Sequence, residues 1–277
     1  MSYDEFRKKE DKLKRIVETM INKGVLDFRV ASVMVIDYLA QNYPMVRIRC
    51  STSQEYSSIK QYDNLFKAYL IKEIVPSWDS NRNFNLLRNL KKLYPHLDIE
   101  IMVNEGCISG CPFRVYHSMF KGTKSKWLRN RYNNFFKQEC GRLYSDNFAL
   151  SLCKSNIIYP WQINEYRKIG IKNFKLVGRN SDEFKTGEYL DIYRQYLLGV
   201  DDIRNILSIP IVWFNHALFK SPGLQSVKVS DVIEVLPSIR FFSEKRFSCA
   251  DVCGVECNYC FEKAKQLETI LQRRKNG

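Results

Sequence analysis

The stretch that decides the fold is Asp98–Ser118, DIEIMVNEGCISGCPFRVYHS. Its first half alternates isoleucine and valine with Glu100 and Met102, and this period of two predicts a half-buried strand. The strand runs into a glycine-bearing loop that carries two thiols, Cys107 and Cys111. Parallel α/β proteins place their sites just beyond the carboxyl ends of strands. We therefore expect a strand followed by a metal-binding or redox loop.

Strand and helix patterns alternate on both sides of this stretch. The expected strands are 26–30, 46–50, 68–71, 98–103 and 173–177, with less regular candidates at 209–214 and 239–242. The expected helices are 3–23, 32–43, a segment ending near 62, 81–93, 160–169, 182–198 and 261–274. Alternation at this spacing predicts an α/β fold with a parallel sheet or a TIM-type barrel.

Size and composition are those of an ordinary globular protein. The chain has 277 residues, of which 45% are hydrophobic and 27% charged, so it can bury a full core. No apolar run approaches the ~20 residues of a membrane span. The first residues, MSYDEFRKKEDKLKR, mix acidic and basic side chains and do not resemble a signal peptide. We expect a cytoplasmic protein without membrane association.

The net charge of +14 is unevenly distributed. Between Arg114 and Arg142 there are eight basic residues and one acidic residue, a net +7, which is half of the total. Four aromatic residues are interleaved with them: Trp127, Tyr132, Phe135 and Phe136. This basic stripe suits an anionic partner such as RNA or a small acid. The alternative is a solvated amphipathic helix that packs its aromatics inward, and the pattern alone does not separate the two.

Nine cysteines are the clearest signal of the composition. An odd count without a secretion signal argues against a disulfide framework and in favour of metal binding. The last four follow the spacing Cys249-x3-Cys253-x3-Cys257-x2-Cys260 and offer enough thiolates for zinc or for an iron–sulfur cluster. We expect an α/β barrel-like domain over 1–248 and a cysteine-rich metal-binding segment with a basic helix over 249–277. Single Cys50 and Cys140 are expected to be buried thiols.

Part of this run, Cys253-Gly-Val-Glu-Cys257-Asn-Tyr-Cys260, has the CxxxCxxC spacing of radical S-adenosylmethionine enzymes. In those enzymes most of a barrel follows the motif, whereas here one helix follows it. We therefore disfavour that interpretation.

Two segments carry a resemblance to a known family. VNEGCISGCPFRVYH, preceded by NRNFNLLRNLKKLYP, resembles the collagenase-like peptidases of family U thirty-two. So does the later block that starts at Cys153, continues through Ile157-Ile158-Tyr159-Pro160 and ends at Gly178-Arg179. The similarity covers about residues 26–200 and extends more loosely to the C-terminal cysteines.

The resemblance implies a TIM-barrel-like domain with a 4Fe-4S cluster. Better understood relatives act in oxygen-independent hydroxylation of ubiquinone precursors or of RNA bases. By this likeness Cys107, Cys111 and Cys153 are cluster ligands, and one of the C-terminal cysteines supplies the fourth. The surplus of thiols leaves one or two clusters open. Because the chain opens on a helix, we expect it to lack the first strands of the family's barrel, so that the barrel is incomplete or is completed by a partner chain.

Other side chains are candidates for roles around such a cluster. Arg114 and Arg179 follow strand ends, where guanidinium groups bind carboxylates or phosphates well, and are candidate substrate-binding residues. His117 and Glu105 are the catalytic candidates, Glu105 as a general base or simply a surface residue. Asp79 or Ser80 is expected to cap the following helix. No nucleophile–base arrangement and no HExxH zinc site are present, so peptidase activity is not expected.

Three hypotheses follow. The first is an oxygen-sensitive iron–sulfur enzyme that modifies an anionic substrate, either RNA or a small aromatic acid, by hydroxylation or related redox chemistry. The second is a non-catalytic, zinc-binding nucleic-acid module. The third is a scaffold subunit that holds a cluster for a partner.

Overall fold

A sheet of five parallel strands forms the centre of the computed structural model, which describes residues 3–104, 106–121, 125–176, 229–245, 249 and 253–276. The strands are β1 (Asp27–Val30), β2 (Arg47–Cys50), β3 (Ile71–Ile74), β4 (Asp98–Met102) and β5 (Asn173–Lys175). Each pairs with the next in chain order, which requires a crossover between every pair. The predicted α/β fold with a parallel sheet is confirmed.

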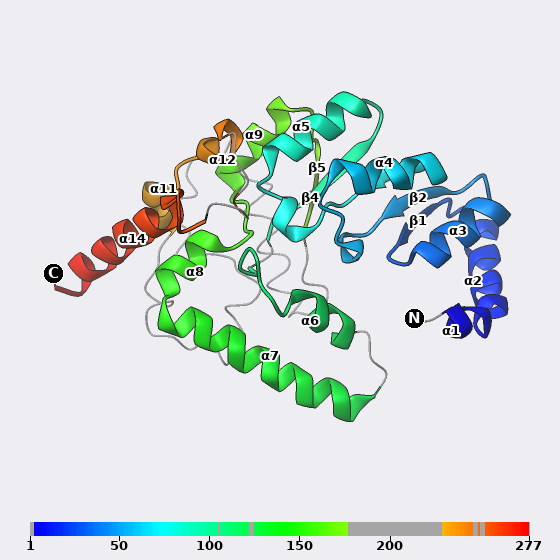
Figure 1. The fold of residues 1–277 in the computed structure, drawn as a ribbon, viewed down its shortest axis with the longest axis horizontal. Helices are drawn as coiled ribbons and strands as arrows, with labels where there is room; N and C mark the ends of the chain where they lie inside the picture. The colour runs from blue at the N-terminus through cyan, green and yellow to red at the C-terminus, as the bar shows by residue number, and fades with distance from the viewer. Residues whose placement is uncertain are drawn as a thin grey trace.

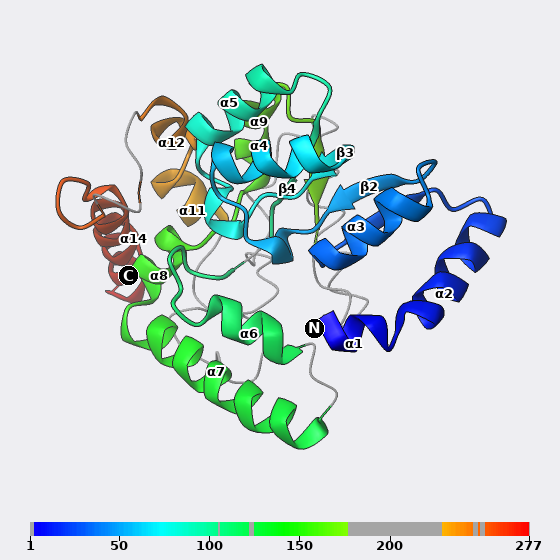
Figure 2. The ribbon, with the colours of Figure 1, turned by 45° about the vertical axis from the view of Figure 1, so that its right-hand side comes forward.

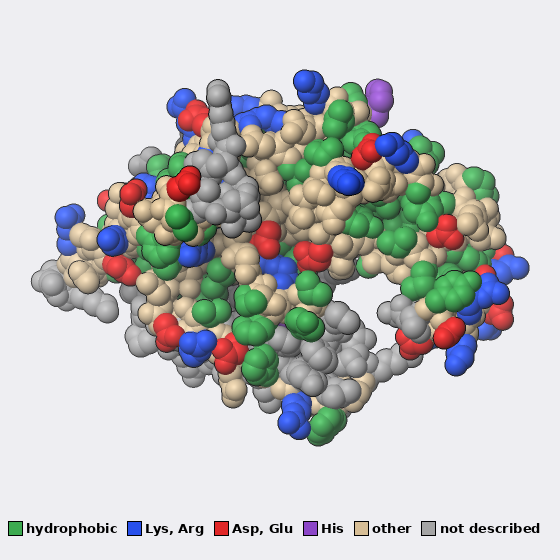
Figure 3. All heavy atoms as spheres, viewed as in Figure 1, with side chains coloured by type: hydrophobic (Ala, Val, Ile, Leu, Met, Phe, Trp, Pro, Cys, Tyr) green, Lys and Arg blue, Asp and Glu red, His purple; other side chains and the backbone are tan. Residues whose placement is uncertain are grey.

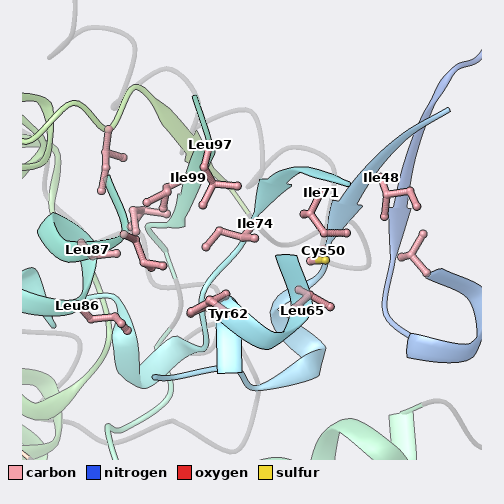
Figure 4. Close-up of a cluster of buried hydrophobic side chains, with 14 of the residues drawn as sticks. Ile48, Cys50, Tyr62, Leu65, Ile71, Ile74, Leu86, Leu87, Leu97 and Ile99 are labelled. Carbon is pink, nitrogen blue, oxygen red and sulfur yellow. The ribbon is translucent and has the colours of Figure 1, made fainter. Parts of the chain in front are cut away.

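Helices from the crossovers cover one face of the sheet (Figures 1 and 2). They are α3 (Val33–Asn42), α4 (Ile59–Ala68), α5 (Phe84–Leu93) and α9 (Ile163–Lys168). At the N-terminus α1 (Tyr3–Arg7) and α2 (Glu10–Asn22) add Phe6 and Val17 to the same core. Figure 4 shows this core, in which Ile48, Cys50 and Ile74 of the sheet face Tyr62 and Leu65 of α4.

The opposite face of the sheet is charged. Arg29 of β1 pairs with Glu73 of β3 at 2.7 Å and with Glu100 of β4 at 2.6 Å, and Arg49 of β2 also pairs with Glu73. Asp27 receives hydrogen bonds from Arg47 and Arg49. In β1, β2 and β4 these residues alternate with the apolar ones that face the core, whereas a register shift between β2 and β3 brings Glu73 to the charged face two residues after the buried Ile71. A sheet with one apolar and one charged face suits a barrel wall, and closure of the barrel stays a prediction.

A second core lies beyond the end of the sheet. It joins α8 (Phe148–Lys154), α11 (Val229–Val235) and the C-terminal helix α14 (Tyr259–Asn276), through Leu152, Val232 and Leu267 among others. Helices α8 and α14 lie side by side in both ribbon views (Figures 1 and 2). This packing holds the start of α14, and with it the C-terminal cysteine segment, against α8.

Helices α6 (Arg114–Lys121) and α7 (Lys126–Asp146) lead from the β4 loop to α8. Among the described residues no helix is long and apolar enough to cross a membrane.

Several predicted boundaries differ from the structure. The helix expected to end near 62 instead begins at Ile59, because Ser58 and Gln61 form a capping box, and β3 follows at 71–74 rather than 68–71. The strand expected at 239–242 is wrong: α12 (Arg240–Glu244) is helical, since a short apolar run has no decisive period. The expected elements at 182–198 and 209–214 lie outside the described residues, as does the end of the strand at 177.

Candidate functional site

The loops after β2, β3 and β4 meet at the carboxyl edge of the sheet. The hydroxyl of Thr52 donates to the carbonyl of Pro76 at 2.7 Å, which ties the first loop to the second. The side-chain amide of Asn81 donates to the carbonyl of Met102 at 2.7 Å, which ties the second to the end of β4. Acidic and basic side chains gather at the centre of the space-filling view, over the loops between the sheet and α6 (Figure 3). The site residues predicted from the stretch 98–118, among them Cys107, Cys111 and Arg114, follow β4 at this edge of the sheet.

Arg114 begins α6 and is only 6% exposed. Its Nη2 donates to the carbonyl of Ile108 at 2.8 Å and lies 3.6 Å from a carboxylate oxygen of Asp79, and its guanidinium covers the ring of Trp78 at 4.8 Å. Its Nε and Nη1 are buried and have no hydrogen-bond partner among the described residues. Buried donors of this kind are costly unless something accepts from them.

Two further residues of this edge, Gln54 and Glu55, were missed by the sequence analysis. Glu55 has a left-handed backbone with φ 54°, a conformation uncommon outside glycine and enriched at functional sites. Burial raises the pKa of its carboxyl, the Arg114 guanidinium opposes that rise, and the charge of Asp79 adds to it. Oε1 of Glu55 and both amide atoms of Gln54 are buried and unpartnered in the described part of the chain.

We call Gln54, Glu55, Trp78, Asp79 and Arg114 the Arg114 cluster. They come from the loops after β2 and β3 and from the start of α6. The sequence analysis proposed a capping role for Asp79, but Asn83 caps α5 instead and Asp79 accepts from the backbone N–H of Gly110 at 3.0 Å. Asp79 therefore binds the cysteine loop.

The cysteine loop, residues 107–111, runs beside the segment that follows Cys153. Backbone N–H groups of Asn156 and Ser109 donate across the gap to the carbonyls of Cys107 and Lys154, each at 3.0 Å. Gly110, with φ 71°, makes the left-handed turn that this course requires. The thiols of Cys107 and Cys111 are partly exposed.

For three other predicted site residues the structure gives little or no detail. His117 lies on α6, one turn after Arg114, and its backbone N–H donates to the carbonyl of Phe113 at 2.8 Å. Glu105 and Arg179 lie outside the described residues.

Cys153 and Cys260 lie together although 107 residues separate them. Cys153 is buried at the end of α8, and the thiol of Cys260, at the start of α14, lies 3.7 Å from the Cys153 carbonyl oxygen. Burial raises the pKa of Cys153 to about 12, with a further contribution from the charge of Cys260. Burial also raises the pKa of Cys260, and the like charges of Cys249, Cys253 and Cys257 add to it.

We call Cys153, Cys249, Cys253, Cys257 and Cys260 the thiol cluster. The Lys245 ammonium contacts the Cys249 sulfur. A tight turn joins the next two cysteines, in which the N–H of Gly254 donates to the carbonyl of Cys257 at 3.0 Å. Within the described residues, no three Cys, His, Asp or Glu side chains are close enough to share one metal ion.

The thiol cluster has the donor type that an iron–sulfur cluster takes, and the prediction of such a cluster rests on the number of its cysteines rather than on a preformed ligand group. A 4Fe-4S cluster takes four thiolates, each on a different iron, so its ligands lie farther apart than those of a single zinc ion. The five cysteines of the thiol cluster, Cys260 included, exceed that need by one. The structure thus places Cys260 beside Cys153, and Cys107 and Cys111 on a loop that runs beside the segment after Cys153; that these cysteines share a metal centre stays a prediction.

Arg82, in the loop after β3, connects that loop to the backbone around Cys153. It donates from Nη1 to the carbonyl of Cys153 at 3.0 Å and from Nη2 to that of Ile157 at 2.9 Å, and it covers the ring of Phe242 at 5.0 Å. No carboxylate pairs with it among the described residues. Its charge opposes the rise in the pKa of both Cys153 and Cys260. Arg82 is not among the site residues predicted from the sequence.

The basic stripe lies mostly on α7. Trp127 is 65% exposed and Phe135 44% exposed, and the guanidinium of Arg131 covers the Trp127 ring at 5.4 Å. Positions 127, 131 and 135 share one face of a helix. Hydrophobic and basic side chains lie next to each other at the lower end of Figure 3. Trp127 is therefore not packed inward, whereas the Phe135 ring lies edge-on to that of Phe113 at 5.7 Å; an anionic partner for the stripe stays a prediction.

No protein-family model matches the chain, and neither a curated protein nor a solved structure matches it.

Proposed function

We propose that this protein is an iron–sulfur enzyme that carries out redox modification, such as hydroxylation, of an anionic substrate. The observation that carries the proposal is the approach of Cys260 to Cys153 beside Arg82, with Cys249, Cys253 and Cys257 within electrostatic range of Cys260. Cysteine is also common as a buried apolar side chain, so what supports the proposal is the placement of Cys260 beside Cys153, 107 residues away in the chain, with three more cysteines near Cys260.

The thiol cluster would supply the ligands of a 4Fe-4S cluster, with Cys107 and Cys111 as the alternative donors from the facing loop. Bound there, the group would supply one-electron chemistry. The chain's own residues have separable tasks. Arg82 fixes the backbone of Cys153 and Ile157 and places a positive charge beside thiolates. Arg114 offers an anion two buried donors at the neighbouring strand end.

The test is the iron and sulfide content of cysteine variants after anaerobic reconstitution. Cys153→Ala and Cys260→Ala are expected to lose most of the iron and sulfide, since each removes one thiolate of the ligand set. Cys50→Ala is the control, because Cys50 is buried among apolar residues of the sheet core. Unchanged iron in both cluster variants would remove the basis of the proposal.

The exposed face of α7 favours a second candidate, a zinc-binding nucleic-acid module. It predicts bound zinc and RNA binding that weakens steeply with salt. Trp127→Ala and Phe135→Ala would then lower the affinity for single-stranded RNA, each by roughly tenfold, through lost base stacking. Bound zinc without sulfide, together with this loss, would favour the module over the enzyme.

A further inference from the structure

The Arg114 cluster contains more unpaired buried polar atoms than a folded protein normally leaves. Nε and Nη1 of Arg114, both amide atoms of Gln54 and Oε1 of Glu55 have no partner within the described ranges. Buried polar groups in folded proteins are almost always hydrogen-bonded. Five such atoms on three side chains at one sheet edge indicate a ligand that completes their hydrogen bonds.

The types of these atoms define the chemistry of the ligand. The free Arg114 nitrogens are cationic donors, so they need an anionic or strongly accepting group. The Gln54 amide both donates and accepts, and the Glu55 oxygen accepts unless it is protonated. A ligand that satisfies all of them therefore carries an anionic acceptor and, beside it, a group that can both donate and accept, such as a hydroxyl.

Charge limits the anion. Arg114 is the cation of the cluster, with Asp79 at 3.6 Å and Glu55 close enough to feel both of their charges. With Glu55 protonated, the direction in which burial raises its pKa, the charges of Arg114 and Asp79 cancel; a monoanion then adds one negative charge beside the Asp79 carboxylate, whereas a phosphate dianion would add two. Burial limits the size: a guanidinium that is 6% exposed does not reach the phosphates of a bulky polymer.

From these observations we propose that Gln54, Glu55 and Arg114 bind the carboxylate and hydroxyl of a small hydroxy acid. This deepens the proposed function, since it selects a small acid over RNA as the anionic substrate. Binding of the acid does not depend on the proposed function; only its redox modification after binding rests on that function. The ring of Trp78, covered by Arg114, forms part of the surroundings of the bound acid.

The experiment measures saturable thermal stabilisation and titration calorimetry of the full chain at constant ionic strength. The probes are lactate, propionate, inorganic phosphate and a single-stranded RNA oligonucleotide. Lactate is expected to bind tighter than propionate by about threefold to tenfold, the effect of one hydrogen bond, and tighter than phosphate. Equal effects of lactate, propionate and phosphate would show general anion binding and would overturn the proposal, as would no saturable binding of lactate.

Variants locate the site. Arg114→Gln is expected to weaken lactate binding by tenfold or more, and Gln54→Leu by about threefold to tenfold. Arg167→Gln, at an exposed position of α9, is the matched control and should bind as the parent does. If Arg114→Gln fails to fold, the Gln54 variant and the lactate-to-propionate ratio still decide. Parent-like binding by the Gln54 variant would refute the assignment.

The measurement is made on both the metal-free and the reconstituted chain, so the two proposals fail separately. A protein that binds lactate but no iron refutes the iron–sulfur function alone. A protein that holds iron but shows no lactate binding in either form refutes the hydroxy-acid site alone.

Discussion

Replacing Arg82 by methionine removes a side chain that joins the β3 loop to the backbone of Cys153 and Ile157. Methionine fills much of the same volume but donates nothing to the carbonyls of Cys153 and Ile157, which lie 3.0 and 2.9 Å from the guanidinium. A hydrogen bond from a charged donor contributes about 1.5–3 kcal/mol. Because Arg82 is partly buried, water compensates part of the loss, and we expect a net destabilisation of about 3 kcal/mol.

The assay is urea unfolding followed by circular dichroism on the metal-free chain, which separates folding from metal binding. The midpoint should fall while the slope stays the same, because the fold and its buried surface are unchanged. For a chain of this size 3 kcal/mol corresponds to a melting temperature lower by about 6–12 °C.

Two variants make the Arg82 prediction specific. Arg82→Lys keeps a single donor group and should lose about half as much stability, since lysine does not bridge two carbonyls in the same planar geometry. Arg167→Met, at an exposed position, should stay within about 0.5 kcal/mol of the parent. A loss below about 1 kcal/mol in Arg82→Met would refute the bridging role that we assign to this arginine.

Three further predictions test other parts of the structure. Arg47 and Arg49 hold the pKa of Asp27 at about 2, against an ordinary 3.8, so the parent should lose stability as the pH falls from about 4 to 2. The contribution is about 1 kcal/mol after solvent screening. In unfolding measured as a function of pH, Asp27→Asn should remove this loss. Leu267→Ala truncates a buried contact of α14 with α8, so it should lower the free energy of unfolding by about 3 kcal/mol and also lower iron retention. The control Leu93→Ala, at an exposed position, should change the free energy of unfolding little. Equal effects of the two variants would contradict the docking of α14. Gly110→Ala meets no atom within 4 Å but must adopt φ 71°, so calorimetry should show a loss of about 1–2 kcal/mol from backbone strain alone, and an unchanged melting temperature would contradict the left-handed turn.

The sheet could be predicted because its signals are local. Strands β1, β2 and β4 alternate apolar and polar residues within four or five positions, and the predicted ranges agree with the structure to within one residue. The position of β3 was missed because the capping box at Ser58 and Gln61, rather than the serine-rich loop before it, sets the start of α4. The helix α12 was taken for a strand because three apolar residues fit either period.

The site was only partly predictable, because its contacts span long distances in the sequence. Cysteine spacing predicts candidate metal ligands, but the approach of Cys153 to Cys260 depends on how α14 docks on α8. The role of Arg82 depends on carbonyls 71 and 75 residues away. Glu55 gave no signal in the sequence, since its left-handed backbone is not a typical choice for glutamate.

The most direct test of the central claim is the iron and acid-labile sulfide content per chain of protein purified without oxygen, measured with zinc and the visible absorption spectrum. The iron–sulfur account predicts brown protein with about four irons and four sulfides per chain, or twice that number if Cys107 and Cys111 help to hold a second cluster. Colourless protein that contains zinc and no sulfide, after anaerobic reconstitution as well, would contradict it.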